Sequence, residues 1–241
     1  GMLDGKWPSG CHWCEDVEKV GATSDRIIHN RHWGGVNDIE QANSTVGKLD
    51  VLELYLDNTC NFSCIYCDSK FSNTWSRELE KFGPISIGST TLKPFNYDKN
   101  LQQDLLKKLW DWLPNNLAEL KELNILGGEP LLLEETFSLL SLIEQHGSTN
   151  LDLTIFSNLG VPNKLIERLI TQLEHLLINK KLRSAKIMAS IDSWGPDIEF
   201  QRYGLDLERF EQNIETILES RIVKLGFNST ITCLSVNTLP V

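Results

Sequence analysis

Three cysteines lie within eight residues of one another, at Cys60, Cys64 and Cys67. They follow residues 51–56, an alternating apolar segment typical of a half-buried strand, and a short polar turn. Thiolates select zinc, copper(I) or iron–sulfur clusters. A structural tetrahedral site is normally closed by four protein ligands, whereas a site that carries out chemistry keeps one position open. The three-thiol loop therefore predicts a metal or cluster with one vacant coordination position.

A second motif, Gly127-Gly128-Glu129-Pro130, follows the strand-like residues 122–126. Two glycines at the end of a strand allow the backbone to approach a ligand closely or to adopt positive φ. A single Gly-Gly-Glu-Pro stretch is usually an ordinary turn. Because this one follows the three-thiol loop in the chain, we expect the two motifs to form one site.

The Cys-x3-Cys-x2-Cys spacing, with Tyr66 before the last cysteine, and the Gly-Gly-Glu-Pro stretch resemble the radical S-adenosylmethionine (radical SAM) superfamily. The resemblance implies that the three cysteines hold three irons of a [4Fe–4S] cluster, and that the fourth iron chelates S-adenosylmethionine. Reductive cleavage of that cofactor yields methionine and a 5′-deoxyadenosyl radical, which abstracts hydrogen from a substrate. It also implies that Tyr66 lies beside the adenine and that Gly127, Gly128 and Glu129 bind the methionine end.

Two further strands end in polar residues. Residues 151–156 run into Ser157-Asn158, and residues 186–193 place Ser190 and Asp192 on one face. The resemblance implies that these four residues line the ribose and carboxylate side of the cofactor. Where the family often has Ser/Thr-Asn-Gly, this chain has its glycine one position later, at Gly160. An Asx turn that closes the strand is the alternative reading of Asn158.

Five strands, most of them followed by helices, carry these residues at their carboxyl ends, as in α/β barrels. The resemblance implies a partial (β/α)6 TIM-like barrel of five to six parallel strands over residues 49–241, with an irregular extension over residues 1–48. The periodicity predicts the following elements: strands 51–56, 122–126, 151–156, 186–193 and 223–233, and helices 72–82, 101–113, 133–145, 162–177 and 207–218.

The segment over residues 83–100 has no clear periodicity and is predicted to be an insertion loop. The helix that follows it has an apolar stripe, which we expect to lie in the core: Leu101, Leu105, Leu109 and Trp112.

The N-terminal extension contains Cys11-His12-Trp13-Cys14, a Cys-x2-Cys half-site for zinc or an auxiliary iron–sulfur cluster. The alternative is a pair of reduced thiols in an apolar cluster with Trp7 and Trp13. The extension resembles the segment before the barrel in twitch- or SPASM-like radical SAM proteins, which implies a peptide or protein substrate.

The 33 acidic and 23 basic residues give a formal net charge of −10, which argues against nucleic-acid binding. No apolar run approaches the roughly 20 residues of a membrane span, and the first residues lack the basic and apolar regions typical of a signal peptide. Six cysteines without a secretion signal favour metal binding over disulfides, and we expect a cytoplasmic protein. The sequence stops just after a strand-like run, so we expect a chain truncated at its C-terminus.

The sequence thus favours a radical SAM enzyme, with no catalytic side chain assigned and with a reductase or a flavodoxin- or ferredoxin-type protein as electron donor. Within the same superfamily, an activase of glycyl-radical enzymes is the alternative. From other classes, the alternatives are a non-catalytic binding module stabilised by zinc, and an incomplete fragment that keeps the fold.

Overall fold

The computed structural model describes residues 5–32 and 49–236. The chain divides into two compact units, residues 1–48 and 49–241. The described part of the first unit consists of a short 3-10 turn, η2 (Ser9–Cys11), and two helices, α1 (His12–Lys19) and α2 (Asp25–His32). Helix α2 was not predicted, since its eight residues include two histidines, two arginines and an asparagine and have no strong apolar stripe.

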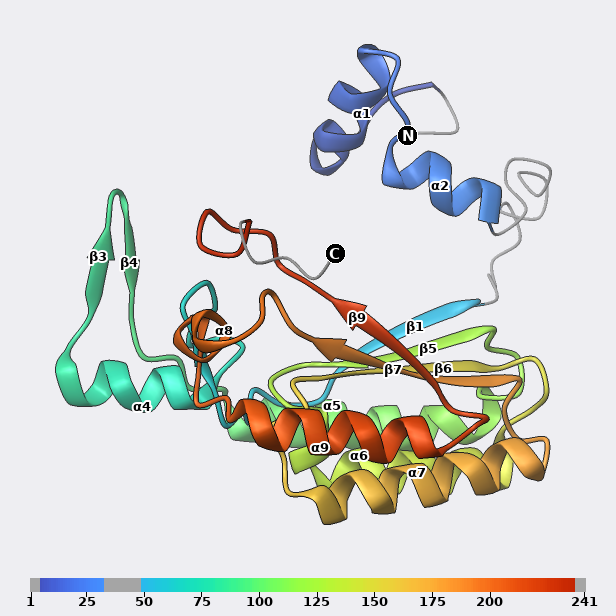
Figure 1. Ribbon diagram of the computed structural model, residues 1–241. Helices are drawn as coiled ribbons and strands as arrows, with labels where there is room; N and C mark the ends of the chain where they lie inside the picture. Colours follow the sequence, from blue (N-terminus) through green and yellow to red (C-terminus); the bar gives the residue numbers. More distant parts are fainter. Residues whose placement is uncertain (1–4, 33–48, 237–241) are drawn as a thin grey trace. The chain divides into compact units, whose positions relative to one another are not determined.

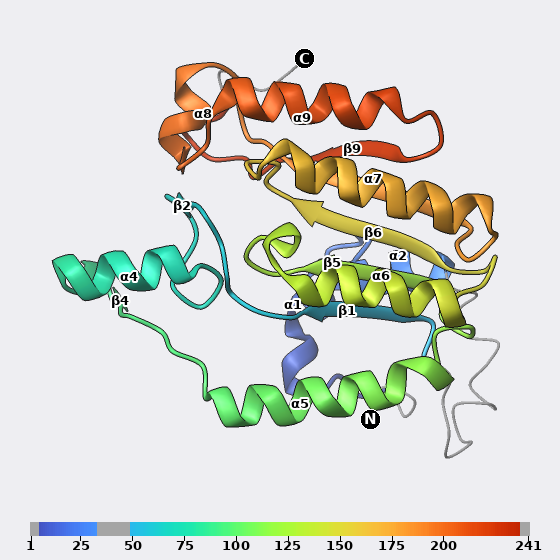
Figure 2. The same ribbon diagram turned by 90° about the horizontal axis from the view of Figure 1, so that it is seen from below.

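The second unit is built on a five-stranded parallel sheet with the order β1-β5-β6-β7-β9 (Figure 1). Its strands are β1 (Val51–Tyr55), β5 (Glu122–Leu126), β6 (Asp152–Ser157), β7 (Ser184–Ser190) and β9 (Lys224–Asn228). Four helices lie along one face of the sheet (Figures 1 and 2): α5 (Lys99–Trp112), α6 (Glu134–His146), α7 (Asn163–Ile178) and α9 (Leu207–Glu219). This arrangement confirms the predicted α/β fold and is consistent with a partial TIM-like barrel.

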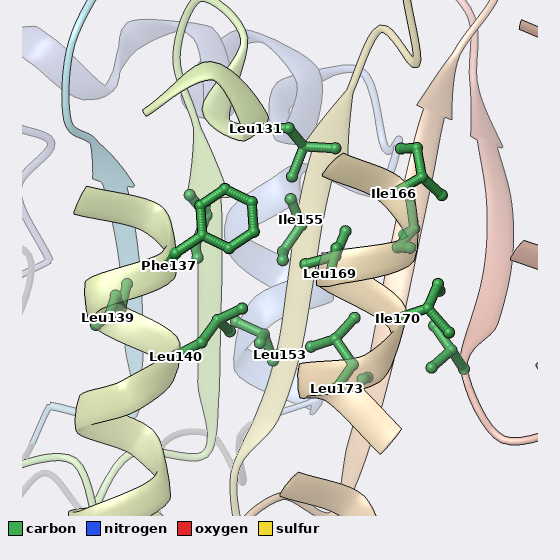
Figure 3. Close-up of a cluster of buried hydrophobic side chains, with 14 of the residues drawn as sticks. Leu131, Phe137, Leu139, Leu140, Leu153, Ile155, Ile166, Leu169, Ile170 and Leu173 are labelled. Atoms are coloured by element: carbon green, nitrogen blue, oxygen red, sulfur yellow. The ribbon is translucent and has the colours of Figure 1, made fainter. Parts of the chain in front are cut away.

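The core lies between this sheet and its helices (Figure 3). Burial alternates along β6, so that Leu153 and Ile155 face the helices while Thr154 faces the other side. Leu153 and Ile155 lie in one core cluster with Phe137 of α6 and Leu169 of α7 (Figure 3). All four apolar side chains are almost completely buried, and full burial of such a side chain contributes about 1.5–3 kcal/mol. The core therefore fixes the register in which the strands present their carboxyl ends.

The prediction of an irregular loop over residues 83–100 is wrong in part. A hairpin of β3 (Ile85–Ile87) and β4 (Thr90–Leu92) forms there, after helix α4 (Asn73–Phe82). Its turn contains Gly88 at φ +58°, a conformation that glycine adopts without steric cost. Each strand has only three residues, and almost all of their side chains are exposed. Such strands are too short to show a clear alternation of buried and exposed residues, so the sequence pattern did not predict them.

The apolar stripe of α5 is also less buried than predicted. Leu101 and Leu105 are 56% and 55% exposed, and Trp112 is 36% exposed, whereas Leu109 packs against the core. The physical reason is position: α5 lies at the edge of the helix layer beside β1 (Figure 2), and β1 is an edge strand of the main sheet. Part of the stripe thus has no partner among the described residues.

The C-terminal half contains short elements that were not predicted. Helix α8 (Pro196–Gln201) leads into β8 (Arg202–Tyr203), which pairs antiparallel with β2 (Ser63–Cys64) in the cysteine loop. Strand β9 ends at Asn228, five residues before the predicted end. No helix in the described part of the chain is long and apolar enough to cross a membrane.

Asn213 provides a test of how α9 is anchored. The fully buried Nδ2 donates to the carbonyls of Leu159 (2.7 Å) and Val161 (2.9 Å), and Oδ1 accepts from Asn163. We expect Asn213→Leu to lower the free energy of unfolding by about 2–4 kcal/mol, because two buried carbonyls lose their donor. Urea unfolding measures this, with Gln212→Leu on the exposed face of α9 as the control. Equal stabilities for the two variants would contradict this account.

Candidate functional site

A cavity of about 360 Å³ lies at the carboxyl edge of the main sheet. Its walls come from the ends of all five strands of the main sheet, from the cysteine loop, from β8 and from the segment after β9. The lining residues are Tyr55, Cys60, Phe62, Cys64, Tyr66, Cys67, Phe71, Leu126, Gly127, Gly128, Phe156, Ser157, Asn158, Ser190, Arg202, Asn228 and Thr230. The volume is in the range of cofactor-sized ligands. The residues predicted to bind the cluster and S-adenosylmethionine gather here, except for Glu129 and Asp192, which are fully buried and do not line the cavity.

The cysteine loop is held from outside by the first turn of α4. The backbone N–H of Cys60 donates to Asn73 Oδ1 (3.1 Å), and its carbonyl accepts from Thr74 Oγ1 (2.6 Å). Trp75 Nε1 donates to the carbonyl of Cys64 (2.8 Å). These bonds satisfy the backbone of a loop that has little regular structure, and they hold its three thiols at one cavity.

Burial raises the pKa of each of the three thiols, Cys60, Cys64 and Cys67, to about 11. They are therefore protonated at neutral pH, and binding of metal must displace their protons. No three His, Cys, Asp or Glu side chains in residues 5–32 and 49–236 already surround one point as the ligands of a single metal ion do. Three soft donors around one cavity fit an iron–sulfur cluster, in which each thiolate binds a different iron.

The two glycines after β5 allow close approach between backbones. Gly127 has φ +129°, and a Cβ on Gly128 would lie 2.3 Å from the carbonyl oxygen of Thr59. The Glu129 N–H donates to that same carbonyl (2.7 Å). The glycines thus bring the Gly-Gly-Glu-Pro segment against the polar turn that precedes the cysteines, and both glycines also line the cavity.

Glu129 is a positioning residue in this structure. Oε1 accepts from Ser157 Oγ (2.8 Å) and from the N–H of Leu131 (3.1 Å), and Oε2 accepts from the N–H of Asn158 (2.7 Å). The carboxylate is fully buried behind the cavity wall, and the assignment of Glu129 to the methionine end of the cofactor stays a prediction. Burial raises the pKa of Glu129 to about 7.

Asn158 has two roles, since it lines the cavity and also closes an Asx turn. Its Oδ1 accepts from the N–H of Gly160 (2.8 Å), and its Nδ2 donates to Asn61 Oδ1 (2.9 Å). Leu159 takes the left-handed conformation, at φ +51°. A Cβ on Gly160 would lie 2.2 Å from the ring of Phe62, so the displaced glycine provides room for that ring.

A buried ion pair that the sequence did not reveal closes the opposite wall. Asp192 accepts from Arg202 Nε (2.8 Å) and Nη2 (3.0 Å), from the Tyr66 hydroxyl (2.5 Å) and from the N–H of Thr230 (2.7 Å). Burial raises the pKa of Tyr66, which keeps its hydroxyl protonated. Among the described residues that line the cavity, Arg202 is the one with a formal positive charge, and β8 places it opposite Cys64. The one signal of it in the sequence is the basic residue Arg202 directly after α8.

The cysteines of the N-terminal unit lie at the start of α1, with Cys11 at the N-cap and Cys14 in the first turn. Arg26 lies over the ring of Trp7, at 5.0 Å from its centroid. The alternative of an apolar cluster with both tryptophans does not hold for Trp13, which is 75% exposed. Metal binding by Cys11 and Cys14 stays a prediction.

The raised pKa of Glu129 predicts a pH dependence of stability. The pKa of this carboxyl is about 7 in the folded state, against an ordinary value of 4.5. Its protonated form therefore contributes fully to the free energy of unfolding below about pH 4.5, and this contribution is lost as the pH rises to about 7. The wild type should therefore lose about 3 kcal/mol more than Glu129→Gln between pH 4.5 and pH 7.5. Urea unfolding at a series of pH values measures the difference, with Glu167→Gln, at an exposed position of α7, as the control. Parallel curves for wild type and Glu129→Gln would refute the assignment.

Comparison with known proteins agrees with the geometry of the cavity. The sequence profile described as the Radical SAM superfamily matches residues 54–238, which include both motifs and the whole cavity. A search of curated proteins gave no significant match. Three thiols, two glycines and the polar ends of β6 and β7 thus meet at one edge of a parallel sheet within a matched domain. The chain belongs to the radical SAM superfamily.

Proposed function

We propose that this protein is a radical SAM enzyme that acts on a peptide or protein, with a [4Fe–4S] cluster held by Cys60, Cys64 and Cys67. The observation that carries the proposal is that these three thiols line one cavity with Gly127 and Gly128. When bound, the cluster and S-adenosylmethionine supply an electron-transfer centre and the 5′-deoxyadenosyl radical that abstracts hydrogen. The peptide substrate class is supported by the likeness of the N-terminal segment to twitch-type proteins.

The residues of the chain bind, orient and shield the reacting groups. Phe62, Leu126 and Phe156 give the cavity apolar walls, which limit the access of water. Arg202 offers a positive charge for the carboxylate of the cofactor, and Asp192 fixes its guanidinium through two hydrogen bonds. We assign Tyr66 to the adenine side, and Ser157, Asn158 and Ser190 to the polar groups of the cofactor.

Reduction of the cluster requires one electron per cleavage. We assign its delivery to a reductase or to a flavodoxin- or ferredoxin-type partner. A module stabilised by zinc would require four convergent ligands. Residues 5–32 and 49–236 contain no group of even three His, Cys, Asp or Glu side chains in such an arrangement.

The first test is anaerobic reconstitution with iron and sulfide, followed by reduction in the presence of S-adenosylmethionine. We expect about four irons per chain and formation of 5′-deoxyadenosine. Cys64→Ala should lose both, because a ligand of the cluster is removed. Cys233→Ala should keep both, since Cys233 is exposed and lies outside the cavity. Tight binding of one zinc ion per chain, without iron uptake or nucleoside formation, would refute the proposal.

Arg202 allows binding and folding to be separated. Arg202→Met should lower stability by about 3–5 kcal/mol, because it leaves Asp192 buried without its partner. The double variant Arg202→Met/Asp192→Asn should regain most of that stability. Both variants should bind S-adenosylmethionine about tenfold more weakly, since the positive charge in the cavity is gone.

Urea unfolding and equilibrium dialysis of the reconstituted proteins measure these two properties. If the double variant regained full affinity for S-adenosylmethionine together with its stability, Arg202 would have a structural role only.

A further inference from the structure

A second cavity, of about 250 Å³, lies between α5 and the edge of β1 that pairs with no strand of residues 5–32 and 49–236. We call it the β1–α5 groove. Its apolar walls come mainly from Leu54, Tyr55 and Leu56 on one side and from Leu101, Leu105 and Leu109 on the other. An engineered apolar cavity of about 150 Å³ binds benzene, so this groove has room for a large apolar side chain.

Within the second unit, the described residues leave the leucines of α5 in the groove largely uncovered. Leu101 and Leu105 lie one helical turn apart on α5, and each is more than half exposed. Among the described residues, β1 pairs with β5 only, so one edge of β1 faces the groove. Contiguous apolar surface of this kind commonly marks a site for a ligand or a partner.

Tyr55 connects the β1–α5 groove to the cavity at the cysteines. It is 57% exposed and lines both cavities. Its ring lies 6.4 Å from that of Phe71, which is on the wall of the cysteine cavity. Tyr55 is therefore part of both walls, and a ligand in the cysteine cavity can extend over its ring toward the groove.

Polar groups at the groove favour an extended peptide as the occupant. The carbonyl of Leu56 points to the groove side, because it accepts from Gln102 Nε2 (3.2 Å) of α5. Backbone groups two residues apart in a strand point to the same side, so those of Leu54 also face the groove. A free strand edge of this kind can bind extended backbone. Asp98 is the charged residue among the described lining residues. Its Oδ1 caps α5 by accepting from the N–H groups of Asn100 and Leu101, and its Oδ2 can accept from a basic group nearby.

We propose that the β1–α5 groove is a substrate subsite that binds an apolar side chain of a peptide, next to a basic residue. The residue that loses hydrogen enters the cysteine cavity on the other side of Tyr55. This inference rests on the proposed function, since it names the kind of peptide on which the enzyme acts.

The test uses a peptide probe and the reconstituted protein with S-adenosylmethionine. The probe is N-acetyl-photoleucine-lysine amide, whose diazirine forms a covalent bond on illumination, and mass spectrometry locates the labelled residues. We expect saturable labelling within residues 97–109. N-acetyl-leucine-lysine amide should suppress it, whereas the serine-lysine and leucine-glutamate analogues should compete several-fold less well.

Two matched variants test the role of the groove. Leu105→Gln should reduce labelling about tenfold, because a leucine-sized apolar contact is lost while helix propensity is kept. Leu218→Gln, at a leucine on α9 that is 62% exposed, should label as the wild type does. Leu105→Ala provides a second variant, which is apolar and only shortens the side chain, with a smaller decrease expected.

Labelling that does not saturate, that serine-lysine amide suppresses equally or that maps elsewhere would overturn the proposal. So would a dimer in sedimentation that Leu105→Gln converts to monomer, since the groove would then be covered by a second copy. Iron content and 5′-deoxyadenosine are measured without peptide in the same preparations. Normal cofactor cleavage without groove labelling refutes this inference alone, whereas absent cleavage refutes the proposed function.

Discussion

The buried carboxylate of Glu129 is the interaction on which the geometry of the cavity depends. It accepts three hydrogen bonds from Ser157, Asn158 and Leu131, while the Glu129 N–H donates to Thr59. One residue thereby ties the ends of β1, β5 and β6, and it holds the turn before the cysteines against the sheet. A carboxylate can be buried in this way because its oxygens accept hydrogen bonds from N–H and O–H groups that would otherwise lack an acceptor.

Asp192 performs the same task on the other wall. It joins the end of β7 to Arg202 of β8, to Tyr66 of the cysteine loop and to Thr230 after β9. Both carboxylates stand behind the residues that line the cavity, as the supporting groups of metal and cofactor sites commonly do. The cysteine loop has little regular structure of its own, so these two networks and the first turn of α4 fix the positions of its thiols.

Prediction from sequence succeeded where the pattern is local. Strands β5, β6 and β7 and helices α6 and α7 follow from alternating or helical apolar spacing, and their cores are buried as expected. It failed for the β3–β4 hairpin, whose short exposed strands have no pattern. The predicted burial of the apolar stripe of α5 was also wrong in part. The spacing of apolar residues shows which face of a helix is apolar, but not whether the neighbouring elements are wide enough to cover that face. The leucines left open there form the β1–α5 groove.

The sequence by itself determined the family motifs, the class of fold and the carboxyl ends of the strands as the place of the site. These features are encoded in spacing and periodicity over a few residues. Only the tertiary structure decided which residues face the cavity and which support it. Arg202 joins the site through a two-residue strand, and Tyr66 meets Asp192 across 126 positions of sequence. Such contacts depend on how distant segments pack, and burial places the side chains of Glu129 and Asp192 behind the cavity wall, where they hold other residues of the site.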